Sequence, residues 1–255
     1  MNQVFTLIRE AGRLVTAPAA AEISAKGRSN FVTDRDVAVQ EFIRKGLSAL
    51  YPAYGFMSEE QENTPDYAQP LWILDPIDGT ANFITRYGLS AISLALMMKG
   101  EVVFGAVYNP YTDELFSAEK GKGAFLNGEP IHADNDVTFE DALIDLGTMP
   151  YYKDRADEVG AMAAAINKNA SDIRRCGSAA LAMCYASCGR TAAMLEGLLQ
   201  PWDYAAGLLI AKESGALTAD WDENPLTAKA PSSVLVAGKK IYQPLVKLIC
   251  EVLKR

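Results

Sequence analysis

Two aspartates, Asp75 and Asp78, stand three residues apart where an apolar run typical of a buried strand ends abruptly. Pro76 between them removes a backbone donor and fixes φ, so we expect the strand to stop here in a turn. Gly79 allows a tight turn, in which its backbone N–H and that of Thr80 can face a phosphate. The turn brings two carboxylates into one space, where a divalent cation relieves their repulsion. A solvated turn is the alternative, because Asp-Pro and Asp-Gly are common turn dipeptides.

Two other acidic segments extend this pattern. Glu59 and Glu60 directly follow a short apolar run, and Asp203 stands where a helix is expected to begin. Taken alone, the glutamates are typical of an exposed charge pair, and Asp203 is typical of a helix N-cap. Taken with Asp75 and Asp78, these residues predict a cluster of hard oxygen ligands, which suits Mg²⁺ better than zinc or copper.

Histidine and cysteine offer fewer possibilities. The only histidine, His132, excludes a His-rich zinc site and is expected on a surface loop. The four cysteines form no CxxC pair. Cys184 and Cys188 stand four apart on an expected helix, so they could form a two-ligand metal face, but small buried hydrophobic residues are the simpler interpretation. Any catalysis is therefore expected to depend on oxygen ligands.

The composition predicts a folded chain with a large core. Its 255 residues suit one large domain or two closely packed ones, with 49% hydrophobic and 22% charged residues. The net charge of −8 argues against a nucleic-acid partner and against an anionic membrane surface. The longest apolar run, near Ala91–Met98, is too short to span a bilayer, and no secretory signal is recognisable. The cytoplasm is therefore the expected location.

Hydrophobic periodicity predicts the elements that must position these residues. A helix is expected at Val4–Val15, a polar loop at Ala25–Asn30, and a second helix after Thr33 or Asp34. Short strands are expected at Tyr54–Met57, Leu71–Leu74, Ile92–Met98, Val102–Tyr108, Glu114–Ala118 and Ala124–Leu126, of which the last four form an antiparallel meander. Further strands are expected at Leu143–Leu146, Thr191–Leu195 and Val234–Ala237, and helices at Asp154–Lys168, Ser178–Ser187, Asp203–Ser214 and Ile241–Leu253.

This order of elements predicts a layered α+β architecture. Helices come first, an antiparallel sheet follows, and the second half alternates between strands and helices. A boundary near Asp134–Glu140 is expected to divide a single domain, 1–255, into sub-domains of about 1–140 and 141–255.

At the acidic segments the sequence resembles the inositol monophosphatase family, and the resemblance covers nearly the whole chain. The family string W-x-x-D-P-x-D-G-T-x-N-F stands at Trp72–Phe83, and W-D-x-A-x-G stands at Trp202–Gly207. Glu59 matches the glutamate of a G-E-E segment, although Ser58 replaces the glycine. Further segments similar to the family are Lys120–Phe125 and Arg175–Ala180. The resemblance implies the layered α-β-α-β-α sandwich of the sugar phosphatases.

The resemblance also implies two or three Mg²⁺ ions per subunit. Its implied metal ligands are Glu59, Asp75 and the Ile77 carbonyl for the first ion, and Asp75, Asp78 and Asp203 for the second. Asp36 matches an aspartate near a third position, although Arg35 stands where the family usually has threonine, and Lys26 matches a loop lysine close to the site. By this resemblance Glu59, Thr80 and Asp78 are catalytic. Two ions clamp the phosphate, Glu59 and Thr80 orient and deprotonate a water, and no phosphoenzyme forms.

The substrate contacts that the resemblance implies lie in two groups. They are Ile77, Asp78, Gly79 and Thr80 around the phosphate, and Gly177, Ser178, Ala179, Glu196 and Asp203 around the alcohol. Glu196 matches a glutamate that binds inositol hydroxyls, which ranks inositol monophosphate first; the alternative is that Glu196 ends a strand at the surface. Related phosphatases of fructose 1,6-bisphosphate, 3′-phosphoadenosine 5′-phosphate, NADP and histidinol phosphate share the metal signature, so these substrates stay open, as does a non-catalytic binding protein. Li⁺ inhibition and a homodimer are also implied.

Overall fold

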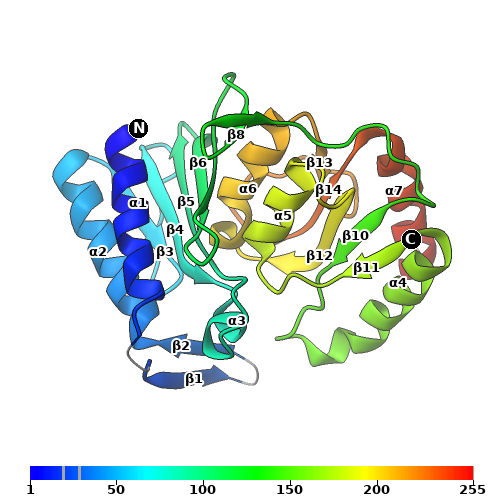
Figure 1. Ribbon diagram of the computed structural model, residues 1–255, viewed down its shortest axis with the longest axis horizontal. Coiled ribbons are helices and arrows are strands. Elements are labelled where there is room, and N and C mark those ends of the chain that lie inside the picture. The colour runs from blue at the N-terminus through cyan, green and yellow to red at the C-terminus, as the bar shows by residue number, and fades with distance from the viewer. Residues whose placement is uncertain (19–20, 28–29, 255) are drawn as a thin grey trace.

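The chain folds into alternating layers of helices and sheets (Figure 1). The computed structural model describes residues 1–18, 21–27 and 30–254. Helices α1 and α2 cover the outer face of a seven-stranded sheet, α5 and α6 lie between this sheet and a five-stranded one, and α4 and α7 cover the far side (Figure 1). The expected layered α-β-α-β-α sandwich is confirmed.

The first layer consists of α1 (Asn2–Val15) and α2 (Asp34–Leu50). Apolar residues on one face of each helix pack on the seven-stranded sheet around Trp72 and Phe104. Thr33 caps α2, as one of the two expected alternatives had it, because its side chain accepts hydrogen bonds from the backbone of Arg35 and Asp36.

The seven-stranded sheet has the order β3-β4-β5-β6-β7-β8-β9. Its strands are β3 (Gly55–Ser58), β4 (Leu71–Asp78), β5 (Ala91–Met98), β6 (Glu101–Asn109), β7 (Glu114–Glu119), β8 (Ala124–Leu126) and β9 (Glu129–Ile131). β3 and β4 are parallel and all later neighbours are antiparallel, so the meander is confirmed. The parallel pair matters for the site, because the carboxyl ends of β3 and β4 meet at one edge of the sheet.

The five-stranded sheet has the order β11-β10-β12-β14-β13. Its strands are β10 (Leu143–Leu146), β11 (Asp172–Arg174), β12 (Ala193–Leu199), β13 (Leu217–Ala219) and β14 (Ser232–Ala237). β10 is parallel to both β11 and β12, so their carboxyl ends also share an edge. The outer face is covered by α4 (Ala156–Asn169), which follows the short helix η1 (Lys153–Arg155), and by α7 (Lys239–Leu253).

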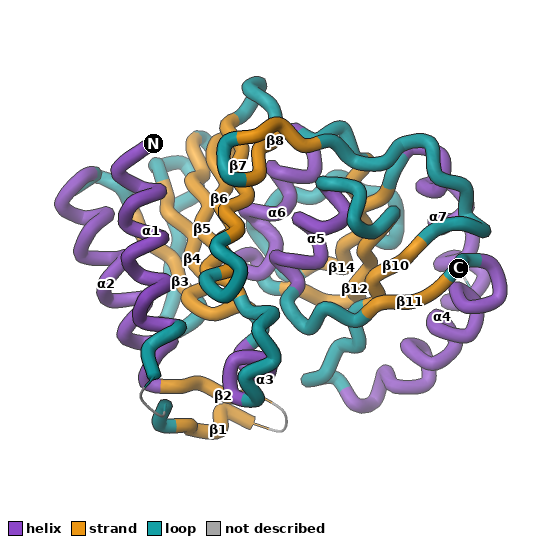
Figure 2. Tube along the Cα trace, in the orientation of Figure 1, coloured by secondary structure: helices purple, strands orange, loops and turns teal. Residues whose placement is uncertain are grey.

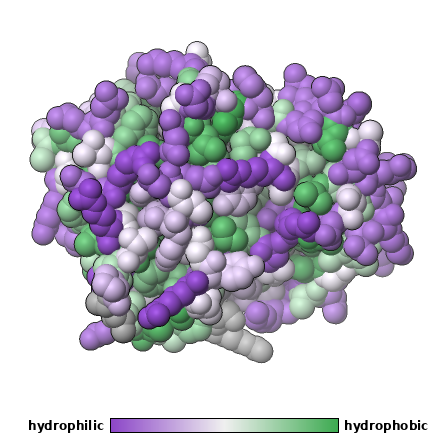
Figure 3. Space-filling view, in the orientation of Figure 1, coloured by the Kyte–Doolittle hydropathy of each residue, from purple (hydrophilic) through white to green (hydrophobic). Residues whose placement is uncertain are grey.

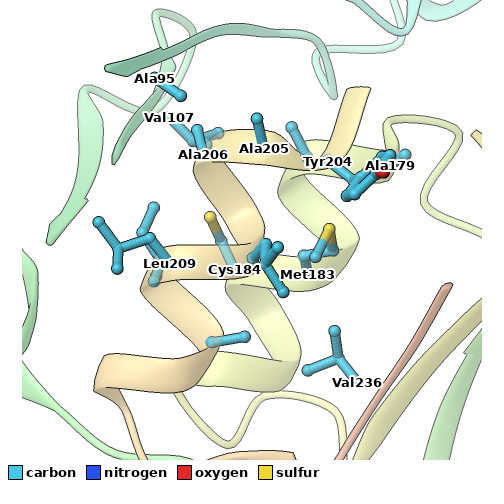
Figure 4. Close-up of a cluster of buried hydrophobic side chains, with 14 of the residues drawn as sticks. Ala95, Val107, Ala179, Met183, Cys184, Tyr204, Ala205, Ala206, Leu209 and Val236 are labelled. Carbon is cyan, nitrogen blue, oxygen red and sulfur yellow. The ribbon is translucent and has the colours of Figure 1, made fainter. Parts of the chain in front are cut away.

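The two inner helices, α5 (Ala179–Ser187) and α6 (Pro201–Glu213), are buried on almost every side. Figure 4 shows α5, which carries Met183 and Cys184, lying beside α6, which carries Ala206 and Leu209. Small residues let α6 lie close to the sheet, and a Cβ on Gly105 would come within 2.6 Å of the Ala206 carbonyl oxygen. This core depends on both halves of the chain at once.

One strand runs further than expected, and an expected loop is instead formed by paired strands. β4 continues through Pro76 to Asp78, because a register shift against β5 between Asp75 and Asp78 accommodates the missing backbone donor. The expected loop at Ala25–Asn30 is wrong for its described residues, since β1 (Ile23–Gly27) and β2 (Asn30–Thr33) pair with each other (Figure 2). This pair of strands belongs to neither large sheet, so hydrophobic alternation in the sequence does not predict it.

The outer surface carries hydrophilic and hydrophobic residues side by side (Figure 3). Among the described residues, no helix combines the length and apolar character that crossing a membrane would require. His132 is exposed just beyond β9, as expected. The four cysteines are free thiols, and Cys184 lies in the core.

Candidate active site

The central turn of the site follows from the irregular end of β4. Pairing with β5 jumps from Asp75↔Ser93 to Asp78↔Ala91, so an extra residue bulges out between the two aspartates. The Asp75 carboxylate accepts a hydrogen bond of 3.0 Å from the Ile77 backbone, which fixes the local bend. Asp75 is 2% exposed and Asp78 is 8% exposed. Two buried carboxylates on one bulge are costly unless other groups balance their charge.

Gly79 makes the turn possible. Its φ of +86° lies in the left-handed region that side chains disfavour. A Cβ there would also come within 3.0 Å of the Leu89 carbonyl and 3.1 Å of the Gly177 carbonyl. The glycine therefore forms the tight turn expected of it, and it also lets two other backbone segments pack closely on the turn.

The turn leads into the short helix α3 (Thr80–Ile84). The Thr80 hydroxyl donates to the Ile77 carbonyl at 3.2 Å, so these two predicted site residues are in contact. Asn82 in the same helix donates to the Leu89 carbonyl at 2.7 Å and to the Cys176 carbonyl at 2.9 Å. Asn82 thus joins the β4 turn to the segment before α5, a role that the sequence reasoning missed although the residue lies inside the family string.

Glu59 reaches the site because β3 and β4 are parallel. Their pairing matches Ser58 with Leu74, and the Glu59 backbone donates to the Leu74 carbonyl at 3.3 Å. Glu59 therefore stands beside Asp75 at the same sheet edge. The sequence alone could not show that these two strands are neighbours.

Asp203 comes from the first turn of α6, at the third helical position. Its carboxylate accepts a 2.7 Å hydrogen bond from the Gln200 backbone, while Pro201 begins the helix. The expected start of this helix at Asp203 is therefore two residues late. An acidic residue at a helix N-terminus is stabilised by the helix dipole, and α6 aims this one between the sheets.

These elements meet in one pocket of about 1000 Å³. Among its lining residues are Glu59, Asp75, Asp78 and Asp203, from three different elements. Ile77, Gly79 and Thr80 belong to the same wall. The predicted acidic cluster is thus brought together rather than scattered.

The carboxylates influence one another strongly. Burial raises the pKa of Asp75 well above its usual value, and the charges of Glu59 and Asp78 raise it further. Burial, followed by the charge of Asp78, has the same effect on the pKa of Asp203. The site therefore holds more negative charge than its own residues neutralise, which favours binding of a cation.

Asp78 differs in being hydrogen-bonded to the start of α5. Its carboxylate accepts from the Ser178 hydroxyl and, at 2.8 Å, from the Ala180 backbone. Burial raises the pKa of Asp78, and these hydrogen bonds oppose that rise. Asp78 and Asp203 are thus both engaged with helix N-termini, which partly compensate their charge.

The residues fit a hard divalent cation by chemistry, although they are not closed around one. Among the described residues, no three acidic, histidine or cysteine side chains are gathered tightly enough to hold an ion as they stand. The donor set nevertheless consists of buried oxygens with excess negative charge, as Mg²⁺ prefers. Asp36 is fully buried, its pKa is raised by burial to about 6, and its Oδ1 has no hydrogen-bond partner among the described residues. Such an orphaned oxygen also suits a cation.

Asp36 stands behind the pocket rather than on its wall. It caps α2 through Thr33, whose backbone donates to it at 2.8 Å. The charge of Glu60 also raises the pKa of Asp36. The side chain of Lys26, which was expected close to the site, lies outside the described part of the structure.

The segment before α5 contributes the next wall. Gly177 and Ala179 line the pocket as expected. Ser178 is fully buried, because its side chain caps α5 and bonds to Asp78. Ser178 is therefore placed to position Asp78 rather than to touch the pocket contents.

Glu196 lies inside β12 and not at an exposed strand end. The residue is 5% exposed, and it lines the pocket. Burial raises its pKa to about 7, while the charge of Arg175 lowers it. The strand was expected to end at Leu195, but it continues to Leu199 because its pairing with β14 resumes after an irregularity beyond Glu196. The alternative that Glu196 ends a strand at the surface is therefore wrong.

The sequence reasoning missed other lining residues. Met149 and Tyr151 from the loop after β10, Tyr87 from the loop after α3, and Arg175 all line the pocket. Burial raises the pKa of Tyr151, and the charges of the acidic cluster raise it further. Arg175 opens a segment that resembles the family, but no pattern in the sequence marks the other three positions, since each lies on a loop whose place is set only by packing.

The layered α-β-α-β-α sandwich, with a pocket lined by buried carboxylates, defines the structural class of this protein. The family model for the inositol monophosphatase family matches residues 2–254. The inositol-1-monophosphatase of Rhizobium meliloti is 36% identical over 236 residues, covering 92% of this chain and 86% of that protein. Nus factor SuhB of Escherichia coli K12 is 34% identical over 228 residues, covering 87% and 85%. An IMPase structure from Thermotoga maritima superimposes with a TM-score of 0.91 at 31% identity, covering 100% and 99%.

This chain belongs to the inositol monophosphatase family. Membership supports a phosphatase that acts on a small phosphorylated substrate, in a family that is generally metal-dependent. The relatives carry different names, so membership by itself leaves the particular substrate open.

Proposed function

We propose that this chain is a Mg²⁺-dependent phosphatase that hydrolyses small phosphate monoesters by direct attack of water. The observation that carries the proposal is that four carboxylates, from β4, from α6 and from the residue after β3, line one pocket. Inositol monophosphate is the first candidate substrate, because Glu196 lines the same pocket and a relative is named inositol-1-monophosphatase.

Mg²⁺ would be held by the oxygens already described. The proposed ligands are Glu59, Asp75, Asp78, Asp203 and the Ile77 carbonyl, with Asp36 near a weaker position. When bound, the ions supply the positive charge that activates water and attracts the phosphate.

The chain's own residues prepare the reaction. The Thr80 hydroxyl donates to the Ile77 carbonyl, which leaves its oxygen lone pairs to accept a hydrogen bond from the attacking water. The Glu59 carboxylate, on the same wall, is assigned as the acceptor of the proton that this water loses. Backbone N–H groups of Gly79 and Thr80 are assigned to the phosphate oxygens, because the left-handed turn exposes the backbone there.

The other end of the pocket would hold the alcohol. Asp203 is assigned to the side of the leaving oxygen, and Gly177 and Ala179 to the ring of the alcohol. No nucleophilic side chain is required, so no covalent phosphoenzyme is proposed.

A substrate panel tests the proposal. We expect phosphate release from inositol 1-phosphate in Mg²⁺, loss of release in EDTA, and recovery when Mg²⁺ is restored. The panel includes fructose 1,6-bisphosphate, 3′-phosphoadenosine 5′-phosphate, NADP and histidinol phosphate. Far faster turnover of one of these would overturn the ranking of substrates, and no release from any ester in excess Mg²⁺ would favour a non-catalytic binding protein.

Family membership supports three further proposals: a homodimer, inhibition by Li⁺, and action in the cytoplasm. Light scattering after gel filtration tests the first, and a Li⁺ titration of phosphate release tests the second. Fractionation of cells of the source organism tests the third.

A further inference from the structure

Arg175 occupies a position that none of the assigned roles uses. It follows β11 directly and lines the pocket. Its Nε donates to the Thr148 hydroxyl at 3.2 Å, and one terminal nitrogen lies 3.8 Å from a Glu196 oxygen. β11 and β12 are both parallel to β10, so Thr148, Arg175 and Glu196 meet at one edge of the five-stranded sheet.

Within this ion pair, Arg175 is the more accessible partner. The Arg175 side chain is 33% exposed, whereas that of Glu196 is 6% exposed. Gly147 packs directly on the Glu196 side chain, where a Cβ would overlap it, and the Met149 backbone hydrogen-bonds to its carboxylate. Contents of the pocket therefore meet the guanidinium before they meet the carboxylate.

The guanidinium retains donors for such contents. Arginine has five N–H donors, of which the Nε donor is used by Thr148. Within the described residues, the terminal nitrogens of Arg175 make no hydrogen bond, and the 3.8 Å approach to Glu196 is an ion pair only. The hydrogen bond from Nε to Thr148 holds the guanidinium in place, and its terminal nitrogens can still donate.

The surrounding charge limits what this edge can bind. Asp145 of β10 is 2% exposed and accepts a 2.9 Å hydrogen bond from the Cys176 backbone, next to Arg175. Arg175 therefore stands beside two buried carboxylates, Asp145 and Glu196, and its positive charge lowers the pKa of both. No positive charge is left over for a second anion, so neutral acceptor oxygens are the better partners.

We propose that Arg175 is a specificity-determining residue that donates hydrogen bonds to hydroxyl oxygens of the leaving alcohol. Thr148 acts as a positioning residue that holds its guanidinium, and Glu196, besides its own place on the pocket wall, forms an ion pair with it. The substrate class that fits is a phosphate ester of a neutral polyol. This inference rests on the proposed phosphatase function and adds to it the residue that recognises the leaving alcohol.

The test compares two esters that share a six-membered ring. Inositol 1-phosphate carries ring hydroxyls and cyclohexyl phosphate carries none. For Arg175→Gln we expect kcat/KM for inositol 1-phosphate to fall by about 10-fold or more, mainly through KM, since the charged donor of these hydrogen bonds is lost. Turnover of cyclohexyl phosphate should stay within about 2-fold of wild type, because that ester makes no such hydrogen bond.

Arg174→Gln is the matched control. Arg174 is the preceding residue, its side chain is 49% exposed, and it pairs with Asp172 outside the pocket. The Arg174→Gln variant should leave kcat/KM for both esters unchanged. Arg175→Lys, which keeps the charge but loses the planar fork, should recover only part of the selectivity for inositol 1-phosphate.

Two outcomes would overturn the inference. An equal fall for both esters in Arg175→Gln would assign Arg175 a structural role, and a wild-type preference for inositol 1,4-bisphosphate that disappears in the variant would assign it to a second anion. Failure of the phosphatase proposal itself looks different, because the wild-type protein would then release phosphate from neither ester.

Discussion

At the scale of single residues, the acidic side chains serve the fold as well as the site. Asp78 accepts hydrogen bonds from the Ser178 hydroxyl and the Ala180 backbone, which links β4 to α5 across a hundred residues of chain. Asp203 likewise accepts from Gln200 at the start of α6. Substitutions at these positions therefore affect stability and chemistry together, and each must be measured separately.

Asp78→Asn separates the two effects. The amide oxygen can still accept from Ala180, but the charge is gone. We expect turnover to fall by about 100-fold or more, because a metal ligand has lost its charge. The free energy of unfolding should fall by only about 1–2 kcal/mol, since the hydrogen bonds from Ser178 and Ala180 weaken but are not lost. Phosphate release and urea unfolding measure the two quantities.

Asp157→Asn provides the matched control for Asp78→Asn. Asp157 is exposed in the first turn of α4 and does not line the pocket, so its variant should keep wild-type turnover and lose at most about 0.5–1 kcal/mol of stability at the helix N-terminus. Near-normal turnover of the Asp78 variant would contradict its place among the metal ligands.

At the scale of elements, the turn after β4 decides where the acidic residues point. The bulge between Asp75 and Asp78 and the left-handed Gly79 belong to one backbone path. Asn82 fixes this path to the segment before α5. The geometry of the site is thus a property of the turn and not of any single side chain.

A pair of glycines tests this dependence. Gly79→Ala must adopt φ near +86° and press its Cβ on two backbone carbonyls, so we expect a loss of several kcal/mol in the free energy of unfolding and little activity. Gly88 has φ of +81° but has no atom within 4 Å of an added Cβ. Gly88→Ala should therefore cost only about 1–2 kcal/mol and keep its activity. Equal effects of the two substitutions in thermal unfolding would show that crowding at Gly79 is unimportant.

At the scale of the whole molecule, α5 and α6 bury their surfaces against both sheets. The chain passes from one sheet to the other between β9 and β10, near the expected boundary at Asp134–Glu140. The seven-stranded sheet depends on α5 and α6, which come from the second half. We infer that the regions 1–140 and 141–255 are layers of one cooperative domain.

A truncated chain of residues 1–140 should therefore fail to fold. It would expose the inner face of the seven-stranded sheet, which carries buried residues such as Val107 and Phe116. Circular dichroism and gel filtration should show an unfolded or aggregated product, while the full chain unfolds in a single transition. A soluble fragment with a cooperative transition would contradict the inference.

The buried carboxylates should also give the whole protein an unusual dependence of stability on pH. Burial raises the pKa of Glu196 from 4.5 to about 7 and that of Asp145 from 3.8 to about 6. These groups bind protons more tightly in the folded chain, so their contribution to stability is complete below about pH 4 and is lost as the pH rises to about 7. In EDTA, the Tm should therefore be higher at pH 5 than at pH 8.

Mg²⁺ should oppose this fall in Tm with rising pH. The cation binds ionised carboxylates in the folded chain, so the rise in Tm on adding Mg²⁺ should be larger at pH 8 than at pH 5. Thermal unfolding at both pH values, with EDTA and with excess Mg²⁺, measures this rise in Tm. A Tm in EDTA that increases with pH would contradict the expected effect of the buried acids.

The sequence by itself determined the features that depend on near neighbours in the chain. The apolar run before Asp75, the glycine after Asp78 and the small residues after Asp203 predicted a strand, a turn and a helix close to their observed places. The periodicity predicted α1, and it placed the start of α2 at Thr33 or Asp34, of which Thr33 is the cap. Local sterics and hydrogen bonding fix such features, so no knowledge of distant residues is needed.

The tertiary structure alone decided which distant residues meet. Glu59 lies beside Asp75 because β3 pairs with β4 in parallel, and Arg175 lies beside Glu196 because β10 is parallel to both β11 and β12. The continuation of β4 through Pro76 depends on a bulge against β5. Strand neighbours and bulges are set by the burial of whole faces, which is a property of the assembled layers and not of any short segment.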